Sequence, residues 1–123
     1  MPGAPRVTGK RKKDMQDGIK RKLLSQSFTV IATPQTSTLT FNMPAGYTRT
    51  VGMYFKPSLA FLVTIASQKA DNNIIQGFST DIGNYGFIEF YNEQLATDVL
   101  TLTAQYVGAY SANFTATFTL AFM

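Results

Sequence analysis

A strict two-residue alternation near the C-terminus is the feature that most constrains how this chain can fold. Residues 110–122, YSANFTATFTLAF, carry apolar or aromatic side chains at every second position, and mostly hydroxyl or amide side chains between them. Only a β-strand turns alternate residues to opposite faces. The segment is therefore predicted to be a strand with its first set facing a core and its second facing away. The first set is Tyr110, Ala112, Phe114, Ala116, Phe118, Leu120 and Phe122, and the second includes Thr115, Thr117 and Thr119.

Shorter segments with strand character precede this one along the chain. Leu39, Phe41 and Met43 alternate with polar residues, and turn-forming stretches such as TPQTS, MPAGY, KADNN and DIGN separate the remaining apolar runs. About eight short strands spaced near ten residues apart, with no helix predicted after Leu24, indicate an all-β fold: an antiparallel β-sandwich or jelly-roll-like barrel. The candidate strands are 28–33, 38–43, 47–55, 59–66, 74–80, 85–91, 98–107 and 110–122.

The candidate strand 59–66 is apolar on both of its faces. Phe61 and Val63 lie on one face, whereas Leu62 and Ala66 lie on the other. An antiparallel strand with one face in water should alternate, so both faces are expected to be covered. Two explanations stay open: a central strand packed between a sheet and loops, or a subunit interface in a homo-oligomer.

The positive charge is concentrated in the first 25 residues. This segment has eight basic and two acidic residues, whereas residues 26–123 have three basic and five acidic residues. Such asymmetry is typical of a basic tail with an anionic partner. We therefore divide the chain into a basic N-terminal arm (1–25) and a β-sandwich domain (26–123). The residues expected to contact an anionic partner or nucleic acid are Arg6, Lys10, Arg11, Lys12, Lys13, Lys20, Arg21 and Lys22.

The arm also carries apolar residues at helical spacing. Met15, Ile19 and Leu23 are four residues apart and would line one face of a short helix over residues 10–24. An isolated helix of this length is marginal in water, so we expect it to order only on a partner, with Leu24 joining the docking set. Three other interpretations stay open: a solvated tail, phosphate contact without base reading, and a nuclear-import signal.

The residue types present exclude most catalytic chemistry. The chain has no cysteine and no histidine, which removes disulfides, thiolate chemistry, the usual zinc sites and histidine acid–base catalysis. Neither a phosphate-binding loop nor a dinucleotide fingerprint is present. Among the few carboxylates, Glu89 stands beside Phe87 and Tyr91 on a predicted strand and reads as an outward residue more readily than as a buried acid. We expect no enzyme, no catalytic residue, no metal and no cofactor.

The hydrophobic runs are too short for a membrane protein. The longest, residues 59–66, falls far short of a bilayer-spanning helix, and no secretory signal is visible. A soluble protein with no membrane partner is predicted.

A short basic arm containing proline and glycine, followed by a cysteine-free, threonine-rich β-sandwich, resembles the general build of virion structural proteins. The resemblance implies a location in the virion, and in the host cytoplasm before assembly, with other virion proteins as partners. A β-domain of under 100 residues is small for a shell-forming jelly roll, which favours an accessory role: a bacteriophage decoration (cement) protein, or a fibre or spike base. The alternative is a nucleic-acid-binding module whose arm supplies the affinity. Salt separates the two, because phosphate binding weakens by orders of magnitude between about 50 and 200 mM.

Overall fold

The structure, a computed structural model, describes residues 21–81 and 85–123. Within these residues the chain forms eight β-strands and no helix, which confirms the all-β prediction. The strands are β1 (Lys22–Val30), β2 (Gln35–Asn42), β3 (Arg49–Tyr54), β4 (Phe61–Ser67), β5 (Asn72–Ser79), β6 (Phe87–Glu93), β7 (Val99–Tyr106) and β8 (Phe114–Phe122).

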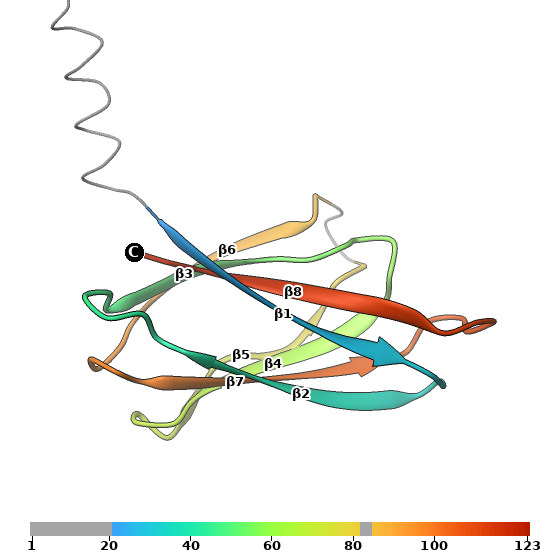
Figure 1. Cartoon of the computed structure of the whole chain (residues 1–123), viewed down its shortest axis with the longest axis horizontal. Coiled ribbons are helices and arrows are strands. Elements are labelled where there is room, and N and C mark those ends of the chain that lie inside the picture. The colour runs from blue at the N-terminus through green and yellow to red at the C-terminus, as the bar shows by residue number, and fades with distance from the viewer. Residues whose placement is uncertain (1–20, 82–84) are drawn as a thin grey trace, which may run out of the picture.

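The strands pair as one long antiparallel ribbon wrapped into two sheets. β1 pairs with β8, β2 with β7, β3 with β6 and β4 with β5. Pairing of β3 with β8 and of β4 with β7 then joins these hairpin-like pairs side by side. The result is sheet A, with strand order β1-β8-β3-β6, packed against sheet B, with order β2-β7-β4-β5 (Figure 1). Eight strands in two sheets connected in this way form a jelly roll.

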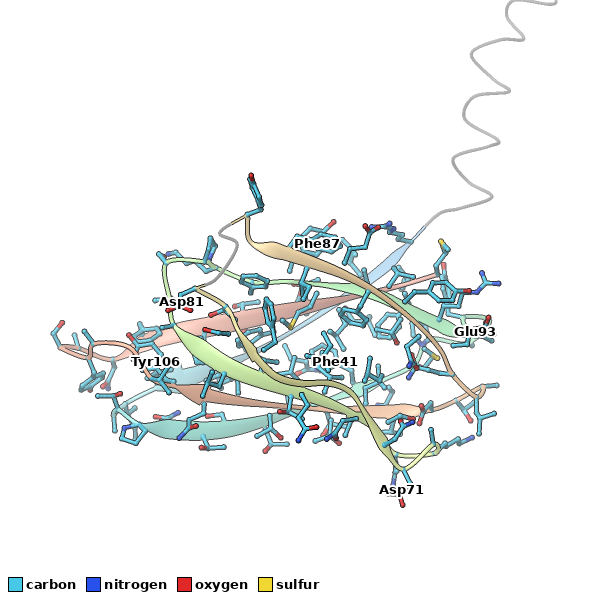
Figure 2. All side chains as sticks on the ribbon, turned by 180° about the vertical axis from the view of Figure 1, so that it is seen from behind. Phe41, Asp71, Asp81, Phe87, Glu93 and Tyr106 are labelled. Carbon is cyan, nitrogen blue, oxygen red and sulfur yellow. The ribbon has the colours of Figure 1, made fainter. Side chains whose placement is uncertain are left out.

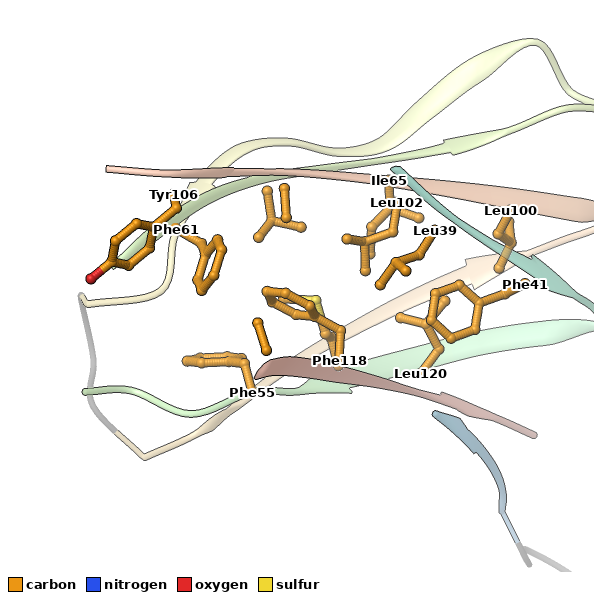
Figure 3. Packing of buried hydrophobic residues seen from close by; sticks show 14 of the residues in the cluster. Leu39, Phe41, Phe55, Phe61, Ile65, Leu100, Leu102, Tyr106, Phe118 and Leu120 are labelled. Atoms are coloured by element: carbon orange, nitrogen blue, oxygen red, sulfur yellow. The ribbon is translucent and has the colours of Figure 1, made fainter. Parts of the chain in front are cut away.

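Aromatic and aliphatic side chains, among them that of Phe41 (Figure 2), fill the space between the two sheets (Figure 3). Phe118 from β8 lies with its ring centroid 5.2 Å from that of Phe61 on β4, in an edge-to-face arrangement, and 6.1 Å from that of Phe28 on β1. Tyr106 closes one end of the core and lies 5.1 Å from Phe61. Because these contacts join strands of both sheets, the core side chains hold the two sheets in their relative orientation and also bury the inner face of each sheet.

The C-terminal strand confirms the predicted register. Phe118 and Leu120 are buried, whereas Thr115 and Thr117 are exposed. The strand is shorter than predicted, because β8 begins only at Phe114. The two earlier members of the alternating set, Tyr110 and Ala112, lie in the preceding loop, where the Tyr110 hydroxyl donates a hydrogen bond to Asn113 Oδ1.

The predicted helix over residues 10–24 is wrong at its C-terminal end. Residues 22–24 are the first three of β1, paired with Phe122, Ala121 and Leu120 of β8. Pairing to a long neighbouring strand outweighs a weak local helical preference. β1 therefore starts inside the segment assigned to the arm. Residues 1–20 lie outside the described residues, and with them the remainder of the helix.

Strand β4 occupies an inner position in sheet B, between β7 and β5. Its inward residues Phe61, Val63 and Ile65 are buried, as its double-sided apolar pattern requires. On its outward face, Leu62 keeps 39% of its surface exposed. Loops of the described chain therefore do not fully cover this face, and covering by another subunit stays a prediction.

Candidate interaction surfaces

Threonines occupy many of the outward positions on sheet B. On β2, Thr36, Thr38 and Thr40 point away from the core and are exposed. The strand register places Thr38 opposite Thr103 of β7, and Thr103 opposite Thr64 of β4. Rows of hydroxyl and methyl groups thus run across the sheet.

Sheet B carries no ionisable acid or base other than a tyrosine. None of its four strands contains Asp, Glu, Lys or Arg. Well-behaved soluble surfaces usually consist of charged residues to about a quarter or more, and the centres of protein interfaces are depleted of them because desolvating a charge is costly. The four strands of sheet B therefore share the depletion of charged residues that is found at the centres of protein interfaces.

The outer face of sheet A combines hydroxyl pairs with charges. Ser25 and Thr119 share a hydrogen bond of 2.7 Å, and Ser27 and Thr117 share another of 2.7 Å. These contacts satisfy the hydroxyls between β1 and β8. Beyond β3 the surface becomes charged: Arg49 lies 5.8 Å above the ring centre of Tyr91, and β6 contributes the exposed Glu89 and Glu93.

A shallow groove lies on the outer side of sheet A, beside the end of β3. Two tyrosines line it, Tyr54 with 40% and Tyr85 with 94% of its surface exposed, together with Lys56 and the threonines of β8. The Tyr54 ring lies 4.4 Å from that of Phe87, which holds it against the sheet. The described residues that line this open groove include no carboxylate.

One buried carboxylate, Asp98, links the two sheets at the end opposite the groove. It is 1% exposed, and it accepts hydrogen bonds from the hydroxyl of Ser67 on sheet B, from the backbone N–H of Lys69 at 2.9 Å and from Gln94 Nε2 at 3.1 Å. Gln94 in turn accepts a hydrogen bond from Thr50 of sheet A. Burial raises the pKa of Asp98, but these hydrogen bonds, led by that from Ser67, outweigh it, so the pKa lies below its ordinary value.

The role of this Asp98 cluster is structural. Both carboxylate oxygens have donors from the protein itself, since the N–H of Val99 also binds Oδ1 at 2.8 Å. A carboxylate with donors at both oxygens holds the strand ends together and keeps its charge. The burial of Asp98 was not predicted from the sequence. The one available signal is its position directly before an alternating strand, four residues after Gln94.

Only two of the predicted anion-contacting residues fall within the described chain. Arg21 Nη2 lies 3.8 Å from Glu89 Oε2, with both side chains well exposed, so Arg21 contacts sheet A of its own domain. Lys22 is exposed on the first residue of β1. Glu89 is thus an outward residue, as its more favoured interpretation held. The other basic residues predicted for this role lie outside the described residues: Arg6, Lys10, Arg11, Lys12, Lys13 and Lys20.

The predicted docking residues are separated by the strand geometry. Leu23 and Leu24 point to opposite sides of β1: Leu23 is 52% exposed, while Leu24 packs against the core. They therefore do not share one apolar helical face. A docking role for Leu23 stays a prediction, and Met15 and Ile19 lie outside the described residues.

Among the residues that the structure describes, no three acidic side chains lie close enough together to hold a metal ion. No helix in residues 21–81 and 85–123 is long and apolar enough to cross a membrane.

Compared by sequence, the chain matches no protein family and no curated protein. Compared by structure, it is similar to the pre-peptidase C-terminal domain of a collagenase from Bacillus anthracis, at 14% identity and a TM-score of 0.45, over 79% of this chain and 85% of that one. It is also similar to the VP2 protein of an infectious bursal disease virus subviral particle, at 15% identity and a TM-score of 0.42. That match covers 85% of this chain and 33% of the viral chain, so this chain spans about a third of it.

A third similar structure is a periplasmic inhibitor of g-type lysozyme from Aeromonas hydrophila, at 16% identity and a TM-score of 0.38, over 83% of both chains. Similarities at this level carry no argument about function.

Proposed function

We propose that this chain is a non-enzymatic structural protein of a virus particle, which uses its jelly roll to pack against neighbouring proteins. The finer proposal is a bacteriophage decoration (cement) protein, or a fibre or spike base, that acts as an oligomer. The observation that carries the proposal is the charge-free sheet B with its exposed threonine face. The jelly roll adds support only by analogy, because capsid proteins and unrelated proteins share this architecture.

The free-energy cost of removing the outer face of sheet B from water depends on which side chains it carries. Burying a lysine or a glutamate in an interface costs several kcal/mol unless it is paired. A threonine presents a methyl group and a hydroxyl, and the hydroxyl can bond to an opposing hydroxyl or backbone group. The outer face of sheet B, with Leu62 on the inner strand β4 near one end of the sheet, can be buried at low cost. The basic arm would add anchoring to a neighbour or to the genome.

Particle incorporation tests the proposal. Native particles from the source of this chain, purified on a density gradient and washed above 200 mM salt, should retain the protein in a fixed ratio to the main shell protein. Absence of the protein from such particles would overturn the proposal. Binding to nucleic acid that disappears between about 50 and 200 mM salt, with no particle association, would favour the nucleic-acid module instead.

A pair of variants identifies the face involved. Leu62→Lys places a charge in the outer face of sheet B, and we expect at least a tenfold loss of incorporation. Ser27→Lys places the same charge on the outer face of sheet A and should leave incorporation unchanged. Circular dichroism of both variants controls for folding. Equal incorporation of both would exclude sheet B as the contact surface.

A further inference from the structure

We infer that two copies of this chain associate edge to edge through β2, which joins their two B sheets into one continuous sheet across a two-fold axis. The inference deepens the proposed function, because it assigns the surface through which the oligomer forms. It stands on a comparison of the four strands that lie at the sheet edges: β1 and β6 in sheet A, β2 and β5 in sheet B.

An edge strand exposes a row of unpaired backbone N–H and C=O groups, which any other strand can pair with. Proteins that stay monomeric protect such edges with charges, prolines, bulges or irregular backbone. Two of the four edges here have this protection along their length, and β1 has it only at its first residue. β1 begins with Lys22 but pairs with β8 over all nine residues without a register shift. β6 carries Glu89 and Glu93 and pairs across a register shift next to Gly52. β5 has two register shifts and the positive-φ Gly77.

β2 has none of these protections. Its sequence, QTSTLTFN, contains no charge, no glycine and no proline. It pairs with β7 over all eight residues, from Gln35 with Tyr106 to Asn42 with Val99, without a register shift. On the far side of a strand this regular, the N–H and C=O groups of every second residue point outward. In Figure 1, β2 lies at the border of the sandwich, next to β7.

The start of β2 is already occupied from within the chain. The Gln35 side chain accepts a hydrogen bond from the N–H of Ile31 at 2.8 Å and donates one to the carbonyl of Thr29 at 2.9 Å. This contact fixes the corner between β1 and β2 and satisfies its polar groups. The part of the edge left for a second strand therefore begins at Thr36.

The remaining segment is complementary to itself. A two-fold axis through Thr38 would place Thr38 opposite Thr38 of the second copy, and Thr36 opposite Thr40 of that copy. All of these side chains lie on the outer face and are exposed in the single chain. Opposing threonines form favourable cross-strand pairs, and no like charges meet. A contact in which one patch meets its own copy is the kind that closes a symmetric dimer, so the second occupant of this edge is another copy of the chain.

Single cysteines test both the contact and its register, because the natural chain has no cysteine. In the full-length protein, Thr38→Cys should cross-link two copies by a disulfide under mild oxidation, since the two sulfurs would face each other across the axis. Thr36→Cys should stay largely uncross-linked. Its own copy would lie four residues away along the edge, about 13 Å, which is too far for a disulfide. Combining Thr36→Cys with Thr40→Cys should restore cross-linking.

Ser27→Cys is the matched control for chance collisions. It lies on an edge strand, β1, and is equally exposed, but it belongs to sheet A. Cross-linking of Ser27→Cys or Thr36→Cys to the same extent as Thr38→Cys would overturn the proposed interface.

Sedimentation of the full chain measures the same contact without a covalent bond. The wild-type protein should sediment at twice its chain mass of 13.5 kDa. Thr38→Lys, which brings two ammonium groups together at the axis, should raise the dissociation constant of the dimer at least tenfold, whereas Ser27→Lys should not. A wild-type monomer at high micromolar concentration would overturn the inference. Failure of the dimer with normal particle incorporation would leave the proposed function standing, and failure of incorporation with an intact cross-link would leave the dimer standing.

Discussion

The two sheets belong to one folded ribbon of strands, yet their outer surfaces differ in charge. Sheet A carries every charged residue found in the strands: Lys22, Arg49, Glu89 and Glu93. It also has a bulge, and its β1 and β8 hydroxyls bond to one another. Sheet B has no charged strand residue. Its strands β2 and β7 pair without a register shift, whereas β4 and β5 pair across two. Two sheets can therefore share one core and still differ in their outer surfaces. The uncharged sheet is the one that we propose as the contact surface.

The largest effect is expected where the two sheets meet. Phe118 extends from sheet A and packs against Phe61 of sheet B, with 1% of its surface exposed. Phe118→Ala should lower the free energy of unfolding by about 3–5 kcal/mol, because it leaves a cavity that both sheets line. Chemical denaturation measures this loss. Thr117→Ala, at the neighbouring outward position, should cost far less, and equal losses would contradict the single shared core.

Asp98 offers a second way to separate the sheets. Asp98→Asn removes the charge that holds the hydroxyl of Ser67 and the amide of Gln94, and should cost about 1–3 kcal/mol. The pKa of Asp98 is lowered in the folded state. Its contribution is therefore present above the ordinary aspartate pKa of about 3.9 and is lost as the pH falls below that value toward the folded-state pKa. Denaturation at pH 7 and at pH 3 should show the wild type losing more stability than Asp98→Asn over this interval. An equal loss would contradict the assignment.

The bulge in sheet A depends on a glycine in a way that can be tested separately. A Cβ on Gly52 would lie 2.3 Å from the Phe87 ring and 3.0 Å from the carbonyl oxygen of Ile88. Gly52→Ala should therefore push this ring away from Tyr54 and cost about 1 kcal/mol or somewhat more. Thermal denaturation measures the cost. A more stable Gly52→Ala protein would show that the bulge does not need the close approach of Phe87.

The smallest effect is expected for the charges of sheet A. Arg21 and Glu89 are 3.8 Å apart and well exposed. Glu89→Gln should change the free energy of unfolding by less than about 0.5 kcal/mol, since water and salt screen such pairs. Denaturation at low and high salt checks this. A larger loss would mean that the charges of sheet A stabilise the fold, rather than only keeping its surface in water.

Much of the fold could be predicted because the alternating segments report directly on their faces. Phe41 and Phe118 stand in such segments, and both are buried as the alternation requires. The start of β1 was missed for the opposite reason. It begins with one basic residue followed by two leucines, KLL, and this sequence fits a helix as well as a strand. Only the pairing with β8 decides between the two.

The candidate surfaces were harder to predict than the fold. To predict that sheet B lacks charge, one must know which strands form this sheet. β2 and β7 are far apart in the sequence but adjacent in space. The same holds for Asp98, whose partners Ser67 and Gln94 come from separate loops and strand ends. The sequence shows which residues are polar, but which of them come together depends on how the strands pair in the folded chain.

The inner position of β8 in sheet A has a consequence for how the protein is made. β8 bonds to β1 on one side and to β3 on the other, and it supplies Phe118 to the core. During synthesis at about 5–20 residues per second, β1 and β3 leave the ribosome well before β8. Sheet A therefore cannot form while the earlier strands are being translated. The apolar faces of β1 and β3 stay exposed to water for several seconds, until β8 is available. We expect the complete sandwich to form only after β8 has been synthesised.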